Sequence, residues 1–113
     1  MSELEELKRK LDRFIKERDW DQFHIPKDLA IAISIEAGEL LEHFQWKEDY
    51  ENKEEMAEEV ADIMLYLLSF CRATDIDLYK ETVKKLEKNK VRYPKDLVKG
   101  KAHKYDHYQN DSE

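Results

Sequence analysis

The chain has 113 residues, a formal net charge of −7, and nearly equal shares of charged and hydrophobic residues (42% and 41%). This length suits one domain, and the apolar content is too high for a disordered protein. An acidic balance with both signs interleaved argues against nucleic-acid and membrane-surface partners, because both need a basic face. The single cysteine, Cys71, rules out an intrachain disulfide and a thiolate metal site. With no signal peptide and no membrane-spanning apolar run, we expect a cytoplasmic protein.

The first half of the chain predicts two helices with an aromatic loop between them. Apolar residues recur at helical spacing over residues 2–18. The loop that follows contains Trp20 and His24 and ends near Pro26, a residue that is common at helix starts. Residues 27–45 are apolar around most of the helix circumference, which predicts a central helix.

The second half of the chain predicts two more helices and a polar tail. A third helix is expected over residues 54–73 and a fourth over residues 78–92, with Asp77 as the N-cap of the fourth. We therefore expect an all-α domain of four helices over residues 1–94, followed by a polar C-terminal tail over residues 95–113.

Two carboxylate pairs of the same design lie in the second and third helices. Glu36 and Glu39 form one pair, and Glu59 and Asp62 form the other. Residues three apart share a face of a helix, so each pair directs two carboxylates at one spot. Both segments are apolar enough to face a core, where unpaired carboxylates are costly. A hard divalent cation such as Mg²⁺, which prefers oxygen ligands, would compensate their charge.

The two pairs are expected to face each other across a helix hairpin. The connection between the two helices is short, which favours antiparallel packing. Glu39 precedes Trp46 by seven residues and Glu59 follows Lys53 by six. At a rise of about 1.5 Å per residue, both glutamates lie about 10 Å from the turn. The sequence therefore predicts one Mg²⁺ site built from all four carboxylates. Gly38, inside the first pair, would allow a neighbouring backbone or a ligand to approach closely.

Other interpretations of the carboxylates fit the sequence less well. A solvated acidic face explains any single pair on a helix, but it does not explain two pairs at matching height among apolar residues. A redox di-iron site would need Glu-x-x-His pairs from two helices, and only His43 is close enough to be recruited. A structural helical adaptor would leave both pairs unexplained.

Aromatic and basic side chains flank the predicted metal site in the sequence. Trp46 and Tyr66 lie within two helical turns of a carboxylate pair, and Trp20 and His24 come from the preceding loop. Some of these rings are explained by ordinary packing, but a Trp in a polar loop is well suited to stacking on a flat ring. A polar stripe of the fourth helix either faces solvent or binds phosphate oxygens. This stripe consists of Lys85, Asn89 and Arg92.

Several short motifs follow one another in a fixed order between Arg18 and Pro94. They are Arg-Asp-Trp-Asp-Gln-Phe-His at 18–24, Glu-Ala-Gly-Glu-Leu at 36–40, Phe-Gln-Trp at 44–46, Glu-Glu-Val-Ala-Asp at 58–62, Tyr66, and Lys-Asn-Lys-Val-Arg-Tyr-Pro at 88–94. Their combination resembles the MazG-type all-α nucleoside triphosphate pyrophosphohydrolases, and among them the small dCTP pyrophosphatase-like branch. The resemblance covers nearly the whole chain. One departure is Asp28, where the family usually has Asn, a conservative change that leaves the chemistry undisturbed.

The resemblance implies an enzyme that hydrolyses (deoxy)nucleoside triphosphates to the monophosphate and pyrophosphate with Mg²⁺. It implies house-cleaning of the nucleotide pool with a dCTP-like preference, on a four-helix bundle assembled as a homodimer or homotetramer. The metal-binding and catalytic residues would be Glu36, Glu39, Glu59 and Asp62. The base and sugar would lie among Trp20, His24, Trp46 and Tyr66. Phosphate or sugar contacts would come from Lys85, Asn89 and Tyr93.

The resemblance also frames the mechanism and its main alternative. A carboxylate that is not fully committed to metal could orient and deprotonate the attacking water, and Glu36 and Glu39 are both candidates. Four short helices do not easily enclose a nucleotide, so we expect contacts between subunits, including Tyr105 and Tyr108 of the tail, to complete the pocket. The alternative is a non-catalytic nucleotide- or metal-binding regulator on the same bundle, which the intact carboxylates disfavour.

Overall fold

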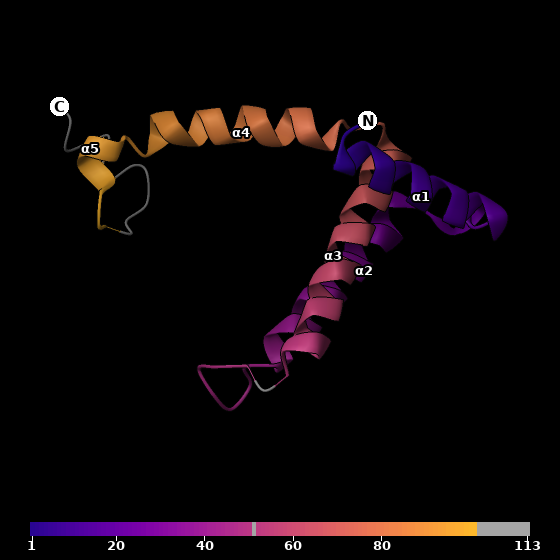
Figure 1. The fold of residues 1–113 in the computed structure, drawn as a ribbon, viewed down its shortest axis with the longest axis horizontal. Coiled ribbons are helices and arrows are strands. Elements are labelled where there is room, and N and C mark those ends of the chain that lie inside the picture. The colour runs from indigo at the N-terminus through magenta and orange to yellow at the C-terminus, as the bar shows by residue number, and fades with distance from the viewer. Residues whose placement is uncertain (51, 102–113) are drawn as a thin grey trace. The chain divides into compact units, whose positions relative to one another are not determined.

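A computed structural model of the chain describes residues 1–50 and 52–101, and all of the regular elements in these ranges are helical (Figure 1). The elements are α1 (Glu3–Glu17), a short 3-10 helix η1 (Asp21–Phe23), α2 (Pro26–Glu42), α3 (Lys53–Thr74), α4 (Leu78–Arg92) and α5 (Lys95–Val98). The prediction of an all-α protein with four long helices is confirmed. The chain divides into two compact units, one over residues 1–76 and one from Asp77 onward.

Polar side chains fix where three of the long helices begin. The side chains of Ser2, Asn52 and Asp77 each accept a hydrogen bond from the backbone N–H three residues later, at 3.2, 3.1 and 3.1 Å. Such N-caps satisfy backbone donors that have no partner within the helix. Asp77 is therefore the cap that the sequence predicts, and α2 begins at Pro26, where the missing N–H costs nothing.

The end of α1 reverses the chain and places Trp20. Asp19 has a φ of 52°, in the left-handed region that a helix often uses to stop and that Asp tolerates better than most residues. The N–H of Trp20 donates to the carbonyl of Ile15 at 3.1 Å, which closes the last turn. The indole ring then packs edge-on against Phe14, with ring centroids 5.5 Å apart. The turn thereby holds Trp20 beside α1.

Helices α2 and α3 form the predicted antiparallel hairpin and lie side by side in Figure 1. Helix α2 ends at Glu42, earlier than the predicted residue 45. Beyond it, the N–H groups of His43, Phe44 and Gln45 donate three residues back, at 3.3, 2.9 and 3.2 Å. After Glu42 the backbone therefore forms tighter turns with hydrogen bonds to the third preceding residue. The apolar residues keep their helical spacing through these turns, so the sequence predicts a longer helix.

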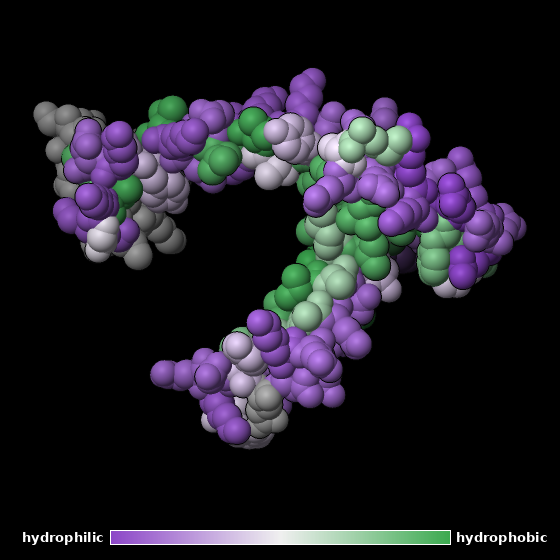
Figure 2. All heavy atoms as spheres, viewed as in Figure 1, coloured by the Kyte–Doolittle hydropathy of each residue, from purple (hydrophilic) through white to green (hydrophobic). Residues whose placement is uncertain are grey.

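Few side chains of the described chain are fully buried. The buried apolar residues are Leu11, Ile15, Leu29, Leu68 and Cys71. Only Leu29 of α2 belongs to this group, although α2 is apolar around most of its circumference. Its Ile35 and Leu41 are 54% and 70% exposed. Among the described residues, α2 is therefore less buried than its apolar circumference predicts. Figure 2 shows hydrophobic residues along the visible face of the α2–α3 hairpin.

The unit from Asp77 onward contains α4 and α5. None of the residues of α4 is buried, and Lys90 and Glu87 form an ion pair at 2.9 Å on its surface. Helix α5 lies in the segment that the sequence predicts as a polar tail, and Pro94 precedes it as its N-cap. Tyr105 and Tyr108 lie outside the described residues. Among the described helices, none is both long and apolar enough to cross a bilayer.

Candidate active site

The helix hairpin brings three carboxylates together. Glu36 from α2 and Glu59 and Asp62 from α3 each offer one oxygen, and these oxygens all lie within 4.8 Å of one another. Two features of the sequence, a shared face on each helix and an equal distance from the turn, predict this convergence. We call this group the carboxylate cluster.

Glu39, the fourth predicted ligand, lies beside the cluster rather than within it. Its carboxyl is not one of the three that share the 4.8 Å group. It is nevertheless close enough to act on Glu59, because a proton shared with Glu39 and repulsion from its charge both raise the pKa of Glu59. Glu39 thus influences the charge of the cluster, although its carboxyl lies outside the group of three.

Two oxygens of the cluster are buried without a donor. Oε2 of Glu36 and Oε2 of Glu59 have no hydrogen-bond partner among the described residues. A proton held between the two carboxyls would supply a hydrogen bond, and this bond is the main reason that the pKa of Glu59 is raised to about 7. Partial burial raises the pKa of Glu59 further, and Glu39 adds to both effects. The site therefore lacks positive charge.

A divalent cation fits this arrangement. Mg²⁺ binds oxygen at about 2.1 Å in octahedral geometry, so ligand oxygens around one ion lie about 3.0 to 4.2 Å apart. Separations of no more than 4.8 Å need only small side-chain rotations to reach that range. No histidine joins the cluster in the described part of the chain, which disfavours the di-iron interpretation and His43 as a ligand.

The raised pKa of Glu59 predicts how the metal-free protein responds to pH. A folded pKa of about 7, above the ordinary 4.5, means that the native state holds this proton more tightly than the unfolded state does. Stability is therefore lost as pH rises from about 4.5 to 7, because the unfolded state releases the proton first. Thermal melts in a chelator should show Tm falling across this window. Glu59→Gln should reduce the fall, and Mg²⁺ should raise Tm most above pH 7. A chelated wild-type protein with the same pH profile as Glu59→Gln would contradict this explanation.

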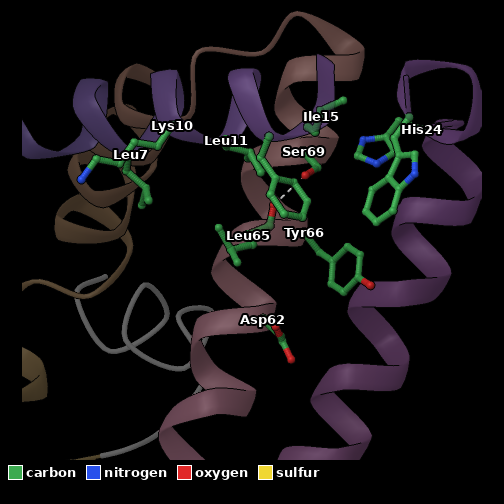
Figure 3. Close-up of a pocket in the computed structure, with 11 residues that line it drawn as sticks. Leu7, Lys10, Leu11, Ile15, His24, Asp62, Leu65, Tyr66 and Ser69 are labelled. Carbon is green, nitrogen blue, oxygen red and sulfur yellow. Dashed lines mark hydrogen bonds between the residues drawn. The ribbon is translucent and has the colours of Figure 1, made fainter. Parts of the chain in front are cut away.

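A pocket of about 380 Å³ adjoins the cluster, at a size common for small-molecule sites. Residues from α1, the loop after it and α3 line the pocket (Figure 3). They are Leu7, Lys10, Leu11, Phe14, Ile15, Trp20, His24, Asp62, Leu65, Tyr66 and Ser69. Three of the four residues predicted to contact a base or sugar, Trp20, His24 and Tyr66, are therefore in one pocket.

Asp62 belongs to both the carboxylate cluster and the pocket. In Figure 3 it lies at one end of the pocket on α3, followed along the helix by Leu65, Tyr66 and Ser69. A ligand whose flat part lies against Trp20 would therefore reach the carboxylates with its other end. This shared residue joins the two halves of the site.

His24 offers an unused polar atom at the pocket. Its Nδ1 is buried and has no hydrogen-bond partner among the described residues. Buried polar atoms are costly unless they are paired, so a ligand group or a water molecule is expected to complete this one. The hydroxyl of Ser69 is already engaged, because it donates to the carbonyl of Leu65 at 2.8 Å. Its lone pairs remain able to accept a hydrogen bond.

Of the other predicted contact residues, Trp46 does not line this pocket. Trp46 follows the end of α2 and is 87% exposed. Lys85 and Asn89 line a shallow depression on α4 with Glu81, Thr82 and Leu86, and Tyr93 directly follows α4. These three residues belong to the unit from Asp77 onward. Their predicted roles in phosphate or sugar binding remain predictions.

Sequence reasoning missed most of the apolar wall of the pocket. The apolar stripe of α1 predicts a face toward the core, and its Leu11 and Ile15 are buried. Leu7, Leu11 and Phe14 also line the pocket, which the stripe does not predict. Amphipathic periodicity reports which face avoids water, and it does not distinguish packing against protein from packing against a ligand. Ser69 was missed as well, because a lone serine in an apolar stripe carries no signal of a binding role.

The α2–α3 hairpin of this all-α chain places a carboxylate cluster beside an aromatic pocket. The chain belongs to the MazG-like family, whose pattern matches residues 31–107. Among curated proteins, it is 40% identical over 111 residues to dCTP pyrophosphatase 1 from Rattus norvegicus and 36% identical to that from Homo sapiens. These matches include 90% of the chain and 65% of the length of each relative.

A solved structure gives the same fold. The crystal structure of a pyrophosphatase from Archaeoglobus fulgidus superposes with a TM-score of 0.77 at 39% sequence identity. The match covers 83% of this chain and 94% of that one. The fold implied by the sequence motifs is therefore confirmed at the level of the family.

Proposed function

We propose that the protein is a Mg²⁺-dependent nucleoside triphosphate pyrophosphohydrolase that prefers dCTP or a closely related nucleotide. The observation that carries the proposal is the position of Asp62, which the carboxylate cluster and the pocket share. A triphosphate needs positive charge beside its oxygens, which a cation held by the carboxylate cluster would supply. A nucleoside needs an apolar, aromatic surface, which the adjoining pocket offers. The names of the relatives, dCTP pyrophosphatase 1 and a pyrophosphatase, support the same reaction and substrate class.

The carboxylate cluster would hold the metal ion, with Glu36, Glu59 and Asp62 as ligands. The ion would supply charge neutralisation at the phosphate oxygens. Without it, an acidic site would repel an acidic substrate. Glu39 is then the carboxylate best placed to accept a proton from the attacking water, since it adjoins Glu59 without belonging to the group of three. This assignment narrows the choice between Glu36 and Glu39 that the sequence leaves open.

The pocket would bind the base and sugar. Trp20 and Tyr66 offer flat faces for a base, and base stacking on an aromatic side chain contributes about 1–3 kcal/mol. Nδ1 of His24 offers a hydrogen bond to the base or the sugar. Fixing the nucleoside in this pocket would place the α-phosphate, rather than the γ-phosphate, nearest to Asp62. Cleavage of the α–β linkage follows from that placement.

We also propose that the active protein is a homo-oligomer. One face of α2 carries exposed apolar and small residues at helical spacing, namely Ile31, Ser34, Ile35, Gly38 and Leu41. A Cβ at Gly38 would meet nothing within 4 Å, so the close approach that this glycine would allow does not occur within the described chain. A second copy packed on this face would explain both features. Light scattering should give a dimer or tetramer at micromolar concentration, and a monomer would contradict this part of the proposal.

A substrate screen tests the proposed function directly. The purified protein should release pyrophosphate from dCTP when Mg²⁺ is present, and the other canonical and modified deoxynucleoside triphosphates should rank below or near it. A chelator should abolish the release. Binding of nucleotide with Mg²⁺ but no product from any triphosphate would instead favour the non-catalytic regulator.

A further inference from the structure

We propose that Arg72 is a positioning residue for the nucleotide pocket, a role that rests on the proposed function. Arg72 does not line the pocket. It acts through Asp12 and Asp21, and it fixes the loop that carries Trp20 and His24.

The guanidinium of Arg72 joins three elements of the unit formed by residues 1–76. Its Nε and Nη2 donate to Oδ1 of Asp12 on α1, at 3.0 and 2.9 Å. Its Nη1 and Nη2 donate to the carboxylate of Asp21 on η1, and the Nη2 bond to Oδ2 is 3.3 Å long. One planar fork therefore connects α1, η1 and α3, which a single ammonium group could not do in the same geometry.

The walls of the pocket come from α1, from α3, and from the two residues on either side of η1, Trp20 and His24. On α3, Arg72 follows Ser69 by three residues and continues the helix face that lines the pocket. Asp12 follows Leu11, a lining residue of α1. Asp21 directly follows Trp20, and its carbonyl accepts the backbone N–H of His24 at 3.2 Å. The guanidinium is thus connected to every wall without contacting the space between them.

Few other interactions hold this loop against α3. The N–H of Trp20 and its ring both contact α1, and the side chain of Gln22 bonds within the loop to Asp19. In the described part of the chain, the hydrogen bonds and ion pairs that run from η1 to α3 all end at Arg72. The side chain of Arg72 is 24% exposed, whereas those of Asp12 and Asp21 are 41% and 55% exposed, so water screens the ion pairs mainly from the carboxylate side. Loss of Arg72 would free the loop to move away from Tyr66 and Asp62.

Kinetics of four variants separate positioning from general stability. Arg72→Met should raise KM for dCTP roughly tenfold and change kcat by less than about threefold, because the carboxylate cluster is untouched. Asp21→Asn should have a similar effect, and the double variant should be little worse, since both changes break one connection. Arg72→Lys should give an intermediate KM, because Lys keeps the charge and loses the fork.

Lys16→Met is the matched control. Lys16 pairs with the same Asp12 at 3.1 Å from within α1, but it does not reach the loop. Its KM and kcat should stay within about twofold of the wild-type values, as expected for an exposed pair. A KM increase as large as that of Arg72→Met would overturn the proposal, because any loss of charge near Asp12 would then have the same effect.

A substrate-free readout follows the loop itself. In a Trp46→Phe background, Trp20 is the only tryptophan. The quenching of Trp20 fluorescence by acrylamide should increase about twofold in Arg72→Met. The indole is 42% exposed and would lose its fixed position. Folded Arg72→Met with unchanged KM, or with unchanged quenching, would overturn the proposal. If Arg72→Met does not fold, the same two results for Asp21→Asn decide it. A wild-type protein inactive on every triphosphate would contradict the proposed function, and the quenching would still test the position of the loop.

Discussion

Replacing Glu59 by Gln is expected to lower kcat for dCTP by about a thousandfold, because the change removes one of three converging carboxylates that would hold the metal ion. The metal-free variant should be at least as stable as the wild-type protein above pH 7. The neutral amide cannot repel Glu36, and it can donate a hydrogen bond to the buried Oε2 of Glu36, which has no donor among the described residues. A loss of activity combined with a gain in stability is characteristic of a functional site.

Glu42→Gln is the matched control for this prediction. Glu42 is the last residue of α2, is exposed, and is not part of the carboxylate cluster. It should keep kcat within about twofold, as surface changes usually do. Steady-state kinetics with saturating Mg²⁺ and thermal melts in a chelator would be measured on both variants. Glu59→Gln with wild-type kcat would contradict the assignment of the cluster as the catalytic metal site.

Replacing Trp20 by Ala should raise KM for dCTP by roughly ten- to a hundredfold, which corresponds to about 1–3 kcal/mol of lost base stacking. Trp20 is 42% exposed and packs against Phe14 on one side, so its removal should cost much less in stability than the loss of a buried core residue. The carboxylate cluster does not depend on the ring, so kcat should change less than KM.

Trp20→Phe tests whether the flat face of the ring is responsible. This variant keeps an aromatic surface and should recover most of the affinity, as measured by titration with a non-hydrolysable dCTP analogue. Trp46→Ala is the comparison for the effect on stability. Trp46 is 87% exposed, so its removal should leave the Tm of the protein unchanged. Trp20→Ala with wild-type affinity and a large fall in Tm would show that Trp20 only packs against α1.

Local sequence patterns are sufficient to predict the helices and the carboxylate cluster. Helix faces, capping residues and the distance from a turn depend on nearby residues, so the amino-acid sequence alone predicts four carboxylates at one place. Glu36, Glu59 and Asp62 converge there, and Glu39 lies beside them. The end of α2 is less predictable, because Phe44 continues the apolar pattern into turns that are not α-helical. The short helix α5 escapes prediction since its four residues carry no periodic signal.

Long-range contacts could not be predicted from the same patterns. Arg72 is 60 residues from Asp12 and 51 from Asp21 in the sequence. Each of the three is a charged residue of a type that is common on protein surfaces, so none of them indicates a partner. Likewise, the apolar face of α2 predicts burial, but the sequence does not say whether the covering surface belongs to the same chain or to another copy. Ile35 and Leu41 are exposed in the part of the chain that the structure describes.

The most direct test of the proposed reaction is the identity of its products. The protein would be incubated with dCTP and Mg²⁺ in oxygen-18 water, and the products would be separated and weighed by mass spectrometry. The proposed placement of the α-phosphate beside Asp62 predicts dCMP that carries the label and pyrophosphate that does not, because water would then attack the α-phosphorus. Label found only in pyrophosphate would contradict this placement of the α-phosphate, and dCDP with orthophosphate would contradict the proposed function altogether.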